Sequence, residues 1–350
     1  MNLLQKIHLY VGLILGLIFF VMALSGTILV YRAEIIGAFM DQLPPSQKLT
    51  IAQEVRALEI LPVAGVSFID FPHWEAPYLR VWYLNGDIEY YNPANLEKIA
   101  IRGLIVESMM FLADLHIHLL AGERGEHISG FFGIALIAMI LSGLWLWWPG
   151  RRGFKFKHIL PKNLKRNSSL KFHRALGVIY SLLLLVIVSS GVGLIFYPQS
   201  QKVIAALTKE DVGIAIELTT RIQRMNNRPM DSIGALVEQF HEQVPDGAIS
   251  RYYAPTKDTP TIARLRYRYP EDWATYGASF ITVDYDQGIV TDFIDYRLSP
   301  QYNRISRKFY PVHAGKMDSN LYKLMVAIIG LSLMAMVLTG FTAWIRKKTR

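Results

Sequence analysis

The chain has 350 residues, of which 52% are hydrophobic and only 19% are charged, a balance too apolar for an ordinary soluble protein of this length. It contains no cysteine, which excludes disulfides, thiolate-held iron–sulfur clusters and covalently attached c-type haem. The net charge of +9 does not indicate nucleic-acid binding, because no nucleic-acid motif is present and the basic residues concentrate beside apolar runs.

Four apolar runs each have the roughly 20 residues needed to cross a hydrocarbon core about 30 Å thick. They are His8–Tyr31, His127–Trp148, His173–Tyr197 and Tyr322–Ile345. The first also resembles a secretory signal, since small residues near Ala23 follow an apolar stretch, but it is long for a signal and its pattern recurs in the third run. We therefore expect four helices that span a lipid bilayer.

The charges between the runs predict the orientation, because short basic loops are retained in the cytoplasm. The link from Arg151 to Arg174 carries only basic charges, whereas all 28 acidic residues lie in Arg32–Glu126 and Pro198–Asn320. We therefore expect both termini in the cytoplasm and the two acidic segments outside.

The expected fold is a membrane all-α four-helix bundle with two extracytoplasmic α+β domains. The expected boundaries are a first transmembrane helix in residues 1–31, a first outside domain in 32–126, a second helix in 127–148, a basic cytoplasmic loop in 149–172, a third helix in 173–197, a second outside domain in 198–320, and a fourth helix with a cytoplasmic tail in 321–350.

Both outside domains show a helix followed by strands. The first is expected to contain a helix at Ile51–Ile60, a strand at Val66–Phe71, and a hairpin of Leu79–Leu84 and Ile88–Tyr91 that turns at Asn85 and Gly86. The second is expected to contain a helix at Ser232–Gln243 and strands at Ile249–Tyr253, Thr261–Tyr269, Ser279–Asp284 and Ile289–Asp295.

The two halves of the chain repeat one another. KIHLYVGLILGL, around His8, aligns with KFHRALGVIYSL, around His173, and a Ser-Gly pair follows each histidine at the same distance. His116 and His313 align the second and fourth runs in the same way. The later matches are Gly133 with Gly330, Ser142-Gly143 with Thr339-Gly340, and Trp147 with Trp344. We interpret this pattern as an internal duplication with a pseudo-twofold axis along the membrane normal.

Such an axis places equivalent histidines opposite each other, with His8 and His173 at the cytoplasmic end and His116 and His313 at the outer end. Two matched pairs stacked through the membrane are what two non-covalent, bis-histidine b-type haems require. Glycines on the same helix faces would leave room for the macrocycles, at Gly12, Gly177, Gly26 and Gly191. The alternatives are histidines that snorkel at the interface and glycines that serve only helix contacts.

His118 complicates the outer pair, because the His116-x-His118 pattern also suits copper or zinc. Only His116 has a counterpart at the repeat spacing, so His118 is expected to be an alternative ligand or a neighbour of the ligands. His127 and His158 lack the right position, while His73 and His241 are expected to be ordinary residues of the outside domains.

An aromatic and charged segment, YRYPEDWATY at Tyr267–Tyr276, interrupts the second outside domain. It is either an ordinary hairpin connection or part of a docking surface for a bulky ligand. In the second case Tyr267, Tyr269, Trp273 and Tyr276 would contact the substrate.

The chain resembles the PepSY-associated transmembrane family over nearly its whole length. The resemblance lies in IHLYVGL, LHIHLLAGERGE, LSGLWLWWP, FHRALG and VHAGK, and more weakly in the helix-then-strands order of the outside domains. It implies a two-haem reductase of ferric siderophores in the bacterial inner membrane, with large periplasmic domains and axial ligands at His8, His116, His173 and His313.

On this basis we expect an oxidoreductase that takes electrons from a cytoplasmic or quinol donor and reduces a ferric siderophore, or another ferric chelate, in the periplasm. One electron labilises the metal, because hard siderophore oxygens hold Fe(III) far more strongly than Fe(II). The rival functions are a cytochrome b subunit of a periplasmic oxidoreductase, a haem-free PepSY regulator of a peptidase, and a metal permease, which would need intramembrane carboxylates that the runs lack.

Overall fold

A computed structural model describes residues 2–62, 64–148, 158, 163, 165–210, 226 and 232–348. The chain divides into two compact units, each built from segments that are distant in sequence. The membrane unit comprises residues 1–32, 107–200 and 309–350, and the sheet unit comprises residues 33–106 and 201–308. Most of the basic loop predicted for residues 149–172 lies outside the described residues.

Four helices in the described part of the chain are long and apolar enough to cross a membrane. They are α1 (Leu3–Val30), α5 (Gly122–Trp147), α6 (Arg166–Ile195) and α12 (Asn320–Lys348). Their polar backbone groups are satisfied within each helix, which is what a hydrocarbon environment demands. The chain is therefore a membrane protein, and these spans agree with the predicted apolar runs.

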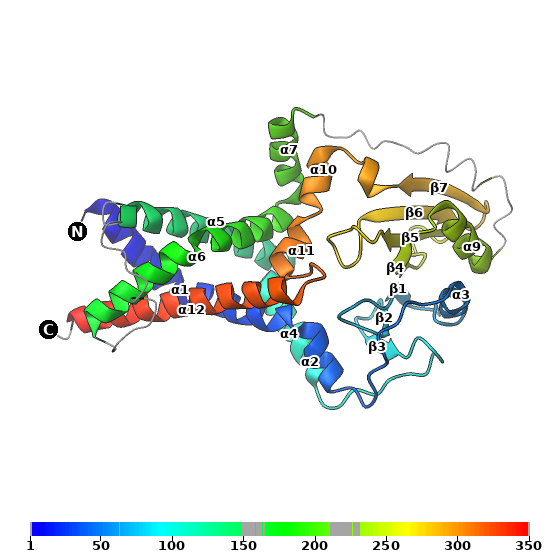
Figure 1. The fold of residues 1–350 in the computed structure, drawn as a ribbon, viewed down its shortest axis with the longest axis horizontal. Coiled ribbons are helices and arrows are strands. Elements are labelled where there is room, and N and C mark those ends of the chain that lie inside the picture. The colour runs from blue at the N-terminus through cyan, green and yellow to red at the C-terminus, as the bar shows by residue number, and fades with distance from the viewer. Residues whose placement is uncertain are drawn as a thin grey trace. The chain divides into compact units, whose positions relative to one another are not determined.

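The four long helices pack so that α1 and α6 each contact both α5 and α12. Both chain termini lie at the same end of this bundle (Figure 1). Two short helices precede the second and fourth spans, α4 (Ile105–His118) and α11 (Phe309–Ala314), and α11 packs against α6.

The sheet unit contains one antiparallel sheet of seven strands in the order β3-β2-β1-β4-β5-β6-β7. The first acidic segment supplies β1 (Val66–Asp70), β2 (Leu79–Tyr83) and β3 (Ile88–Tyr91). The second supplies β4 (Ala248–Tyr253), β5 (Ile262–Arg268), β6 (Ser279–Asp284) and β7 (Ile289–Ile294). The predicted hairpin and its turn at Asn85-Gly86 are confirmed, as are the later strands to within one or two residues.

Helices occupy the connections of the sheet unit. They are α2 (Arg32–Ala38), α3 (Ile51–Ile60), α7 (Tyr197–Thr208), α9 (Ile233–Gln243), the 3₁₀ helix η3 (Tyr296–Leu298) and α10 (Gln301–Ser306). The two helices predicted from sequence, α3 and α9, are confirmed. Thr50 and Ser232 cap them by accepting hydrogen bonds from backbone N–H groups in the first turn.

The expectation of two separate outside domains is wrong, because the two segments share one sheet and one core. Strand β1 pairs with β4 through Phe68–Tyr253, Ile69–Tyr252 and Asp70–Arg251. Each segment alone has one core-forming helix and three or four strands, and would leave an open strand edge at β1 or β4. Joining them removes one edge from each segment and places α3 beside α9 over a common apolar face.

The core lies between that face and the two helices, because residues alternate across every strand. Leu58 of α3 and Phe240 of α9 pack with Ile69, Leu265 and Ile281, and all five are at most 3% exposed. A further link between the helices is the contact of His241 Nε2 with Glu54 Oε2 at 2.5 Å. The helix-covered face therefore ties the two segments together by burial of apolar surface.

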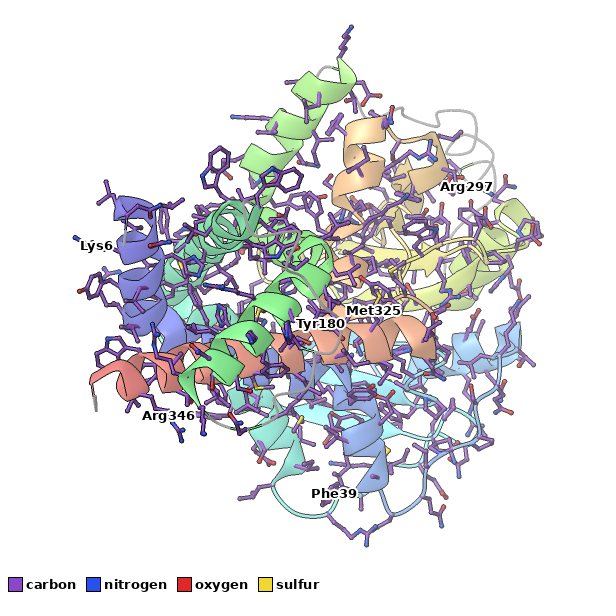
Figure 2. All side chains as sticks on the ribbon, turned by 60° about the vertical axis from the view of Figure 1, so that its left-hand side comes forward. Lys6, Phe39, Tyr180, Arg297, Met325 and Arg346 are labelled. Carbon is purple, nitrogen blue, oxygen red and sulfur yellow. The ribbon has the colours of Figure 1, made fainter. Side chains whose placement is uncertain are left out.

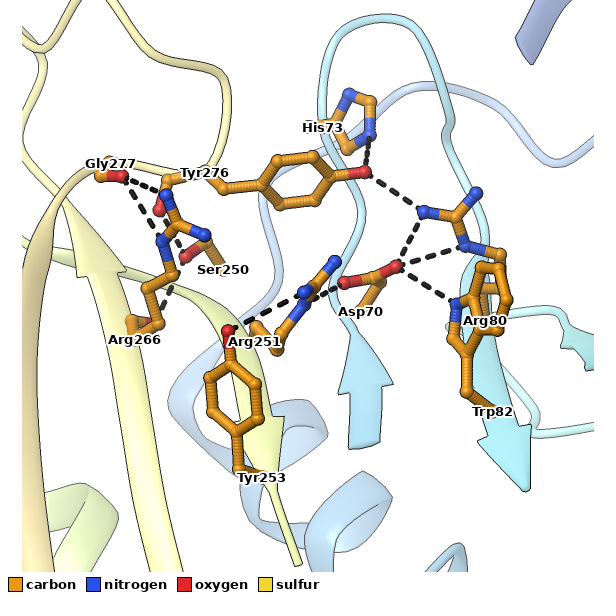
Figure 3. Close-up of polar contacts among 10 residues, drawn as sticks. All are labelled: Asp70, His73, Arg80, Trp82, Ser250, Arg251, Tyr253, Arg266, Tyr276 and Gly277. Atoms are coloured by element: carbon orange, nitrogen blue, oxygen red, sulfur yellow. Dashed lines mark hydrogen bonds and ion pairs between the residues drawn. The ribbon is translucent and has the colours of Figure 1, made fainter. Parts of the chain in front are cut away.

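On the opposite face, a buried carboxylate joins the same two segments (Figure 3). Asp70 of β1 accepts hydrogen bonds from Arg80 of β2, from Trp82 Nε1 at 3.3 Å, and from Arg251 Nε of β4 at 2.5 Å. Burial raises the pKa of Asp70, but the charges of Arg80 and Arg251 outweigh it and hold the pKa below its usual value.

We expect Asp70→Asn to destabilise the sheet unit by about 3 kcal/mol at neutral pH, because it leaves two poorly exposed arginines without a counter-charge. The stabilisation by Asp70 is present above the ordinary carboxyl pKa of about 3.9 and is lost as the pH falls towards the lower folded-state value. The difference between variant and parent should therefore shrink in acid. Thermal unfolding of the full chain in detergent measures it.

The matched control for that measurement is Asp87→Asn, in the exposed turn between β2 and β3. It should change the stability by no more than about 0.5 kcal/mol. Equal unfolding temperatures for the two variants would contradict the role assigned to Asp70.

Candidate functional site

The membrane unit brings together the first pair of predicted histidines. His8 lies in the second turn of α1 and His173 in the third turn of α6, near the end of the bundle that carries the chain termini. Their ring centroids are 6.4 Å apart and their planes are nearly perpendicular, at 89°.

The second predicted pair also meets. His116 lies in the last turn of α4 and His313 in the last turn of α11. Their ring centroids are 6.0 Å apart and their planes are inclined by 35°. The His116 ring packs on Gly26 of α1, and this glycine is 18 positions after His8, so about 27 Å of helix rise lies between the two pairs.

In the first half of the chain, serine hydroxyls hold the histidine rings. His8 Nδ1 lies 2.9 Å from Ser142 Oγ on α5, and His116 Nδ1 lies 3.1 Å from Ser25 Oγ on α1. Each serine already donates its hydroxyl proton to a helix carbonyl, Met139 for Ser142 and Val21 for Ser25. The hydroxyl oxygens are therefore acceptors, and the histidines donate from Nδ1.

In the second half, backbone carbonyls perform the same task directly. His173 Nδ1 is 2.8 Å from the Met336 carbonyl of α12, and His313 Nδ1 is 2.8 Å from the Ile187 carbonyl of α6. A carbonyl only accepts, so both imidazoles carry their proton on Nδ1.

All four histidines are thus fixed in the same tautomer, with Nε2 unprotonated. Within the described part of the chain, no hydrogen bond engages Nε2 of any of the four. A histidine whose Nδ1–H is bonded to a neighbour and whose Nε2 is free has the arrangement typical of a metal-binding imidazole. This arrangement can supply two nitrogen ligands at each of two positions.

Glycines of the neighbouring helices provide the surfaces on which these rings lie. A Cβ added to Gly143 would stand 3.2 Å from His8 Cε1, and one added to Gly26 would stand 2.8 Å from His116 Cε1. In the second half of the chain, a Cβ at Gly191 would stand 2.5 Å from His313 Cε1, whereas one at Gly340 would stand 3.6 Å from His173. Each histidine ring therefore lies on the glycine of a repeated Ser-Gly or Thr-Gly pair. We call these four glycines, Gly26, Gly143, Gly191 and Gly340, the ring seats.

This placement changes the interpretation of the predicted glycines. Gly26 and Gly191 contact histidine rings, and a Cβ at Gly12 or Gly177 would face the Met139 or Met336 side chain. Sequence reasoning missed Ser25 and Ser142 as hydrogen-bond partners and Gly143 and Gly340 as ring seats. The signal was present, because all four belong to the repeated pairs.

The loop that follows His116 is strained. Leu119 and Leu120 both have positive φ, at 50° and 60°, where a bulky side chain costs roughly 1–2 kcal/mol. After His313 the chain turns at Gly315, whose φ of 70° costs a glycine little. The breaks end α4 two residues after His116 and α11 one residue after His313.

The remaining histidines lie elsewhere. His118 Nδ1 bonds Asp114 at 2.8 Å and His127 stacks on Phe196, while His73 contacts Tyr276 in the sheet unit. His116, and not His118, is the residue that meets His313. No group of three or more His, Cys, Asp or Glu side chains suited to a metal ion occurs among the described residues.

The predicted substrate contacts need correction. Tyr267 and Tyr269 are 0% and 2% exposed and belong to the core of the sheet unit, so they do not contact a ligand at the surface. They point inwards because they occupy core-facing positions of β5 and its continuation. Trp273 is 52% exposed, and Tyr276 is half-buried with its ring 5.1 Å from the Arg251 guanidinium.

Four apolar spans and a separate α+β sheet unit define a membrane protein with a folded domain outside the helix bundle. The chain belongs to the family described as the PepSY-associated TM region, whose model matches residues 5–347. The resemblance expected from the sequence is therefore confirmed over nearly the whole chain. A comparison with curated proteins finds no match.

Proposed function

We propose that the chain is a two-haem cytochrome b that reduces a ferric chelate, of the ferric-siderophore type, on the outer side of the bacterial inner membrane. His8 and His173 would hold one haem, and His116 and His313 the other. The observation that carries this proposal is the set of four histidines paired at two levels, each with Nδ1 bonded and Nε2 free.

The spacing within each pair supports a shared iron. If two imidazoles shared one metal through Nε2, their centroids would lie at most about 6.3 Å apart, because each nitrogen would lie about 2 Å from the metal and about 1.1 Å from its ring centre. The centroid distances of 6.4 and 6.0 Å fit this value.

The number of ligands also favours haem over a bare ion. Structural and catalytic zinc sites take three or four protein ligands, and copper sites take a similar number. Each pair here offers two, and the described residues contain no larger cluster. A haem, which brings its own four nitrogens, would need no more than the two histidines that each pair supplies.

Matching contacts in the two halves support the internal duplication and its pseudo-twofold axis. Gly133 of α5 approaches Val192 of α6, and Gly330 of α12 approaches Thr27 of α1. These partners are themselves equivalent in the repeat, as are the histidine seats. Such an arrangement gives the two members of each histidine pair equivalent positions on the helices.

When bound, the two haems supply one-electron transfer from a cytoplasmic or quinol donor to the ferric chelate. The protein's own residues fix the tautomer of each histidine and its position along the helix bundle. Basic residues at the end of the bundle with both termini, including Lys6 of α1 and Arg346 of α12 (Figure 2), support placing that end in the cytoplasm and the sheet unit in the periplasm.

Protein purified after expression with ample haem should show the visible difference spectrum of a b-type cytochrome and contain two haems per chain. The measurement is a reduced-minus-oxidised spectrum with extraction of the haem for counting. A featureless spectrum from well-folded protein would overturn the proposal and favour a regulator.

Loss of a histidine should remove only the haem of its own pair. His173→Ala should leave about one haem per chain, and His116→Ala and His313→Ala should each lose the other haem and abolish reduction of an external ferric chelate. His118→Ala is the matched control, because its ring bonds Asp114, and it should keep both haems. Retention of the outer haem in His116→Ala together with its loss in His118→Ala would transfer the ligand to His118.

Two glycine substitutions test the ring seats. Gly191→Ala puts a methyl group 2.5 Å from His313 Cε1 and should displace this ring, with loss of the outer haem or a changed midpoint potential. Gly340→Ala places the same group at an ordinary contact distance of 3.6 Å from His173 and should keep both haems unchanged. A redox titration of both variants distinguishes them, and equal behaviour would contradict the seat assignment.

A further inference from the structure

The sheet face opposite α3 and α9 carries an unusual concentration of arginines. Along β5, Ala263, Leu265 and Tyr267 point into the core, so the alternate residues Arg264 and Arg266 point to the other face. Arg251 of β4 stands directly opposite Arg266 across the strand pair. Like charges opposite each other destabilise a sheet, so this pairing is costly for folding alone.

Three guanidinium groups surround one aromatic ring on that face. The Phe280 centroid of β6 lies 3.9 Å from Arg264, 5.5 Å from Arg266 and 5.6 Å from Arg307, which follows α10. The Tyr276 ring lies 5.8 Å from Arg266 on the neighbouring side. We call Arg264, Arg266 and Arg307 the arginine cluster.

The cluster has little negative charge to balance it. Among the described residues, none of its three arginines forms an ion pair with a carboxylate. The carboxylate of Asp70 pairs with Arg80 and Arg251 instead. Nε of Arg264 and Nε of Arg307 are buried without a hydrogen-bond partner in the same part of the chain. Such donors are expensive to leave unpaired.

The pKa values of two of these arginines also indicate positive charge that is not fully balanced. Burial, and after it the charge of neighbouring arginines, lowers the pKa of Arg264 and of Arg266, and Tyr253, with Asp292 at Arg264, offsets this only in part. Arg266 has a partner in the Gly277 carbonyl, a neutral group that does not cancel its charge. All three side chains remain partly exposed, so a ligand can reach them.

We propose that the arginine cluster, with Phe280 and Tyr276, binds a ferric chelate of net negative charge. This inference rests on the proposed function for the identity of the metal complex, and it adds the charge class of the substrate. Guanidinium forks match the paired oxygens of carboxylate and catecholate groups, and the two aromatic rings contact the apolar parts of a bulky ligand. Arg80, which Asp70 holds, donates a hydrogen bond to the Tyr276 hydroxyl at 3.0 Å and so helps to position this ring.

The test is binding to the full-length protein in a neutral detergent, with gallium(III) chelates that match the ferric ones in size and charge but are not reduced. A trianionic tris-catecholate complex is compared with a neutral tris-hydroxamate complex by equilibrium dialysis. The trianion should bind at least about tenfold more tightly, with an affinity that falls as salt is added.

Arg264→Gln and Arg307→Gln should each weaken binding of the trianion by about tenfold and leave the neutral complex almost unchanged. Arg56→Gln is the matched control, because Arg56 is exposed on α3, which covers the other face of the sheet. The unfolding temperatures of the three variants exclude loss of folding as the cause.

Equal affinity for the two complexes, or equal effects of Arg264→Gln and Arg56→Gln, would overturn the inference. The haem count of the same preparation separates it from the proposed function. Protein with two haems but no preference for the trianion contradicts only the charge class, whereas charge-selective binding by haem-free protein contradicts only the electron-transfer role.

Discussion

The functional geometry of the membrane unit depends on how each imidazole is held by the helix next to its own. One ring nitrogen donates a hydrogen bond to an oxygen of that helix. The ring lies against a glycine, where no side chain separates it from the helix backbone. A helix in lipid has no spare backbone groups, so the acceptor is either a carbonyl that already receives a hydrogen bond or a serine hydroxyl attached to one. Ser25 and Ser142 extend the acceptor outwards, whereas Met336 and Ile187 accept directly.

This dependence explains why small residues and histidines are coupled in the sequence. A ring that must approach a helix axis closely requires glycine at the contact. The hydrogen bond requires an oxygen nearby, either on the serine directly before the glycine or on the backbone carbonyl one turn before it. The two halves meet these requirements with different chemistry at the acceptor, so the serine is one of two solutions. The tautomer is the same in all four cases, so Nε2 of each ring carries no proton and can act as an acceptor.

Much of this fold was predictable because its elements carry strong local signals. Apolar runs, turn residues such as Asn85-Gly86 and strand alternation depend on neighbours in sequence, and the corresponding helices and strands are where they were expected. The pairing of His8 with His173 was predictable from the repeat alone. The joint sheet was not predictable, because the local sequences of β1 and β4 do not determine which strand pairs with the open edge of each. Tyr267 and Tyr269 were misjudged for a related reason: composition marks an aromatic segment, but only the strand register decides which face its rings occupy.

The pairing of β1 with β4 has a consequence for the order in which the protein is made. Between Asp70 and Ala248 the chain contains α5 and α6, so two membrane spans are inserted before the sheet can close. Until then the first segment exposes an unpaired strand edge and half of an apolar core, a state that invites aggregation. Sequence-distant contacts of this kind also form slowly. Completion of the sheet unit is therefore a late event of biogenesis, because the sheet needs strands from both of its segments.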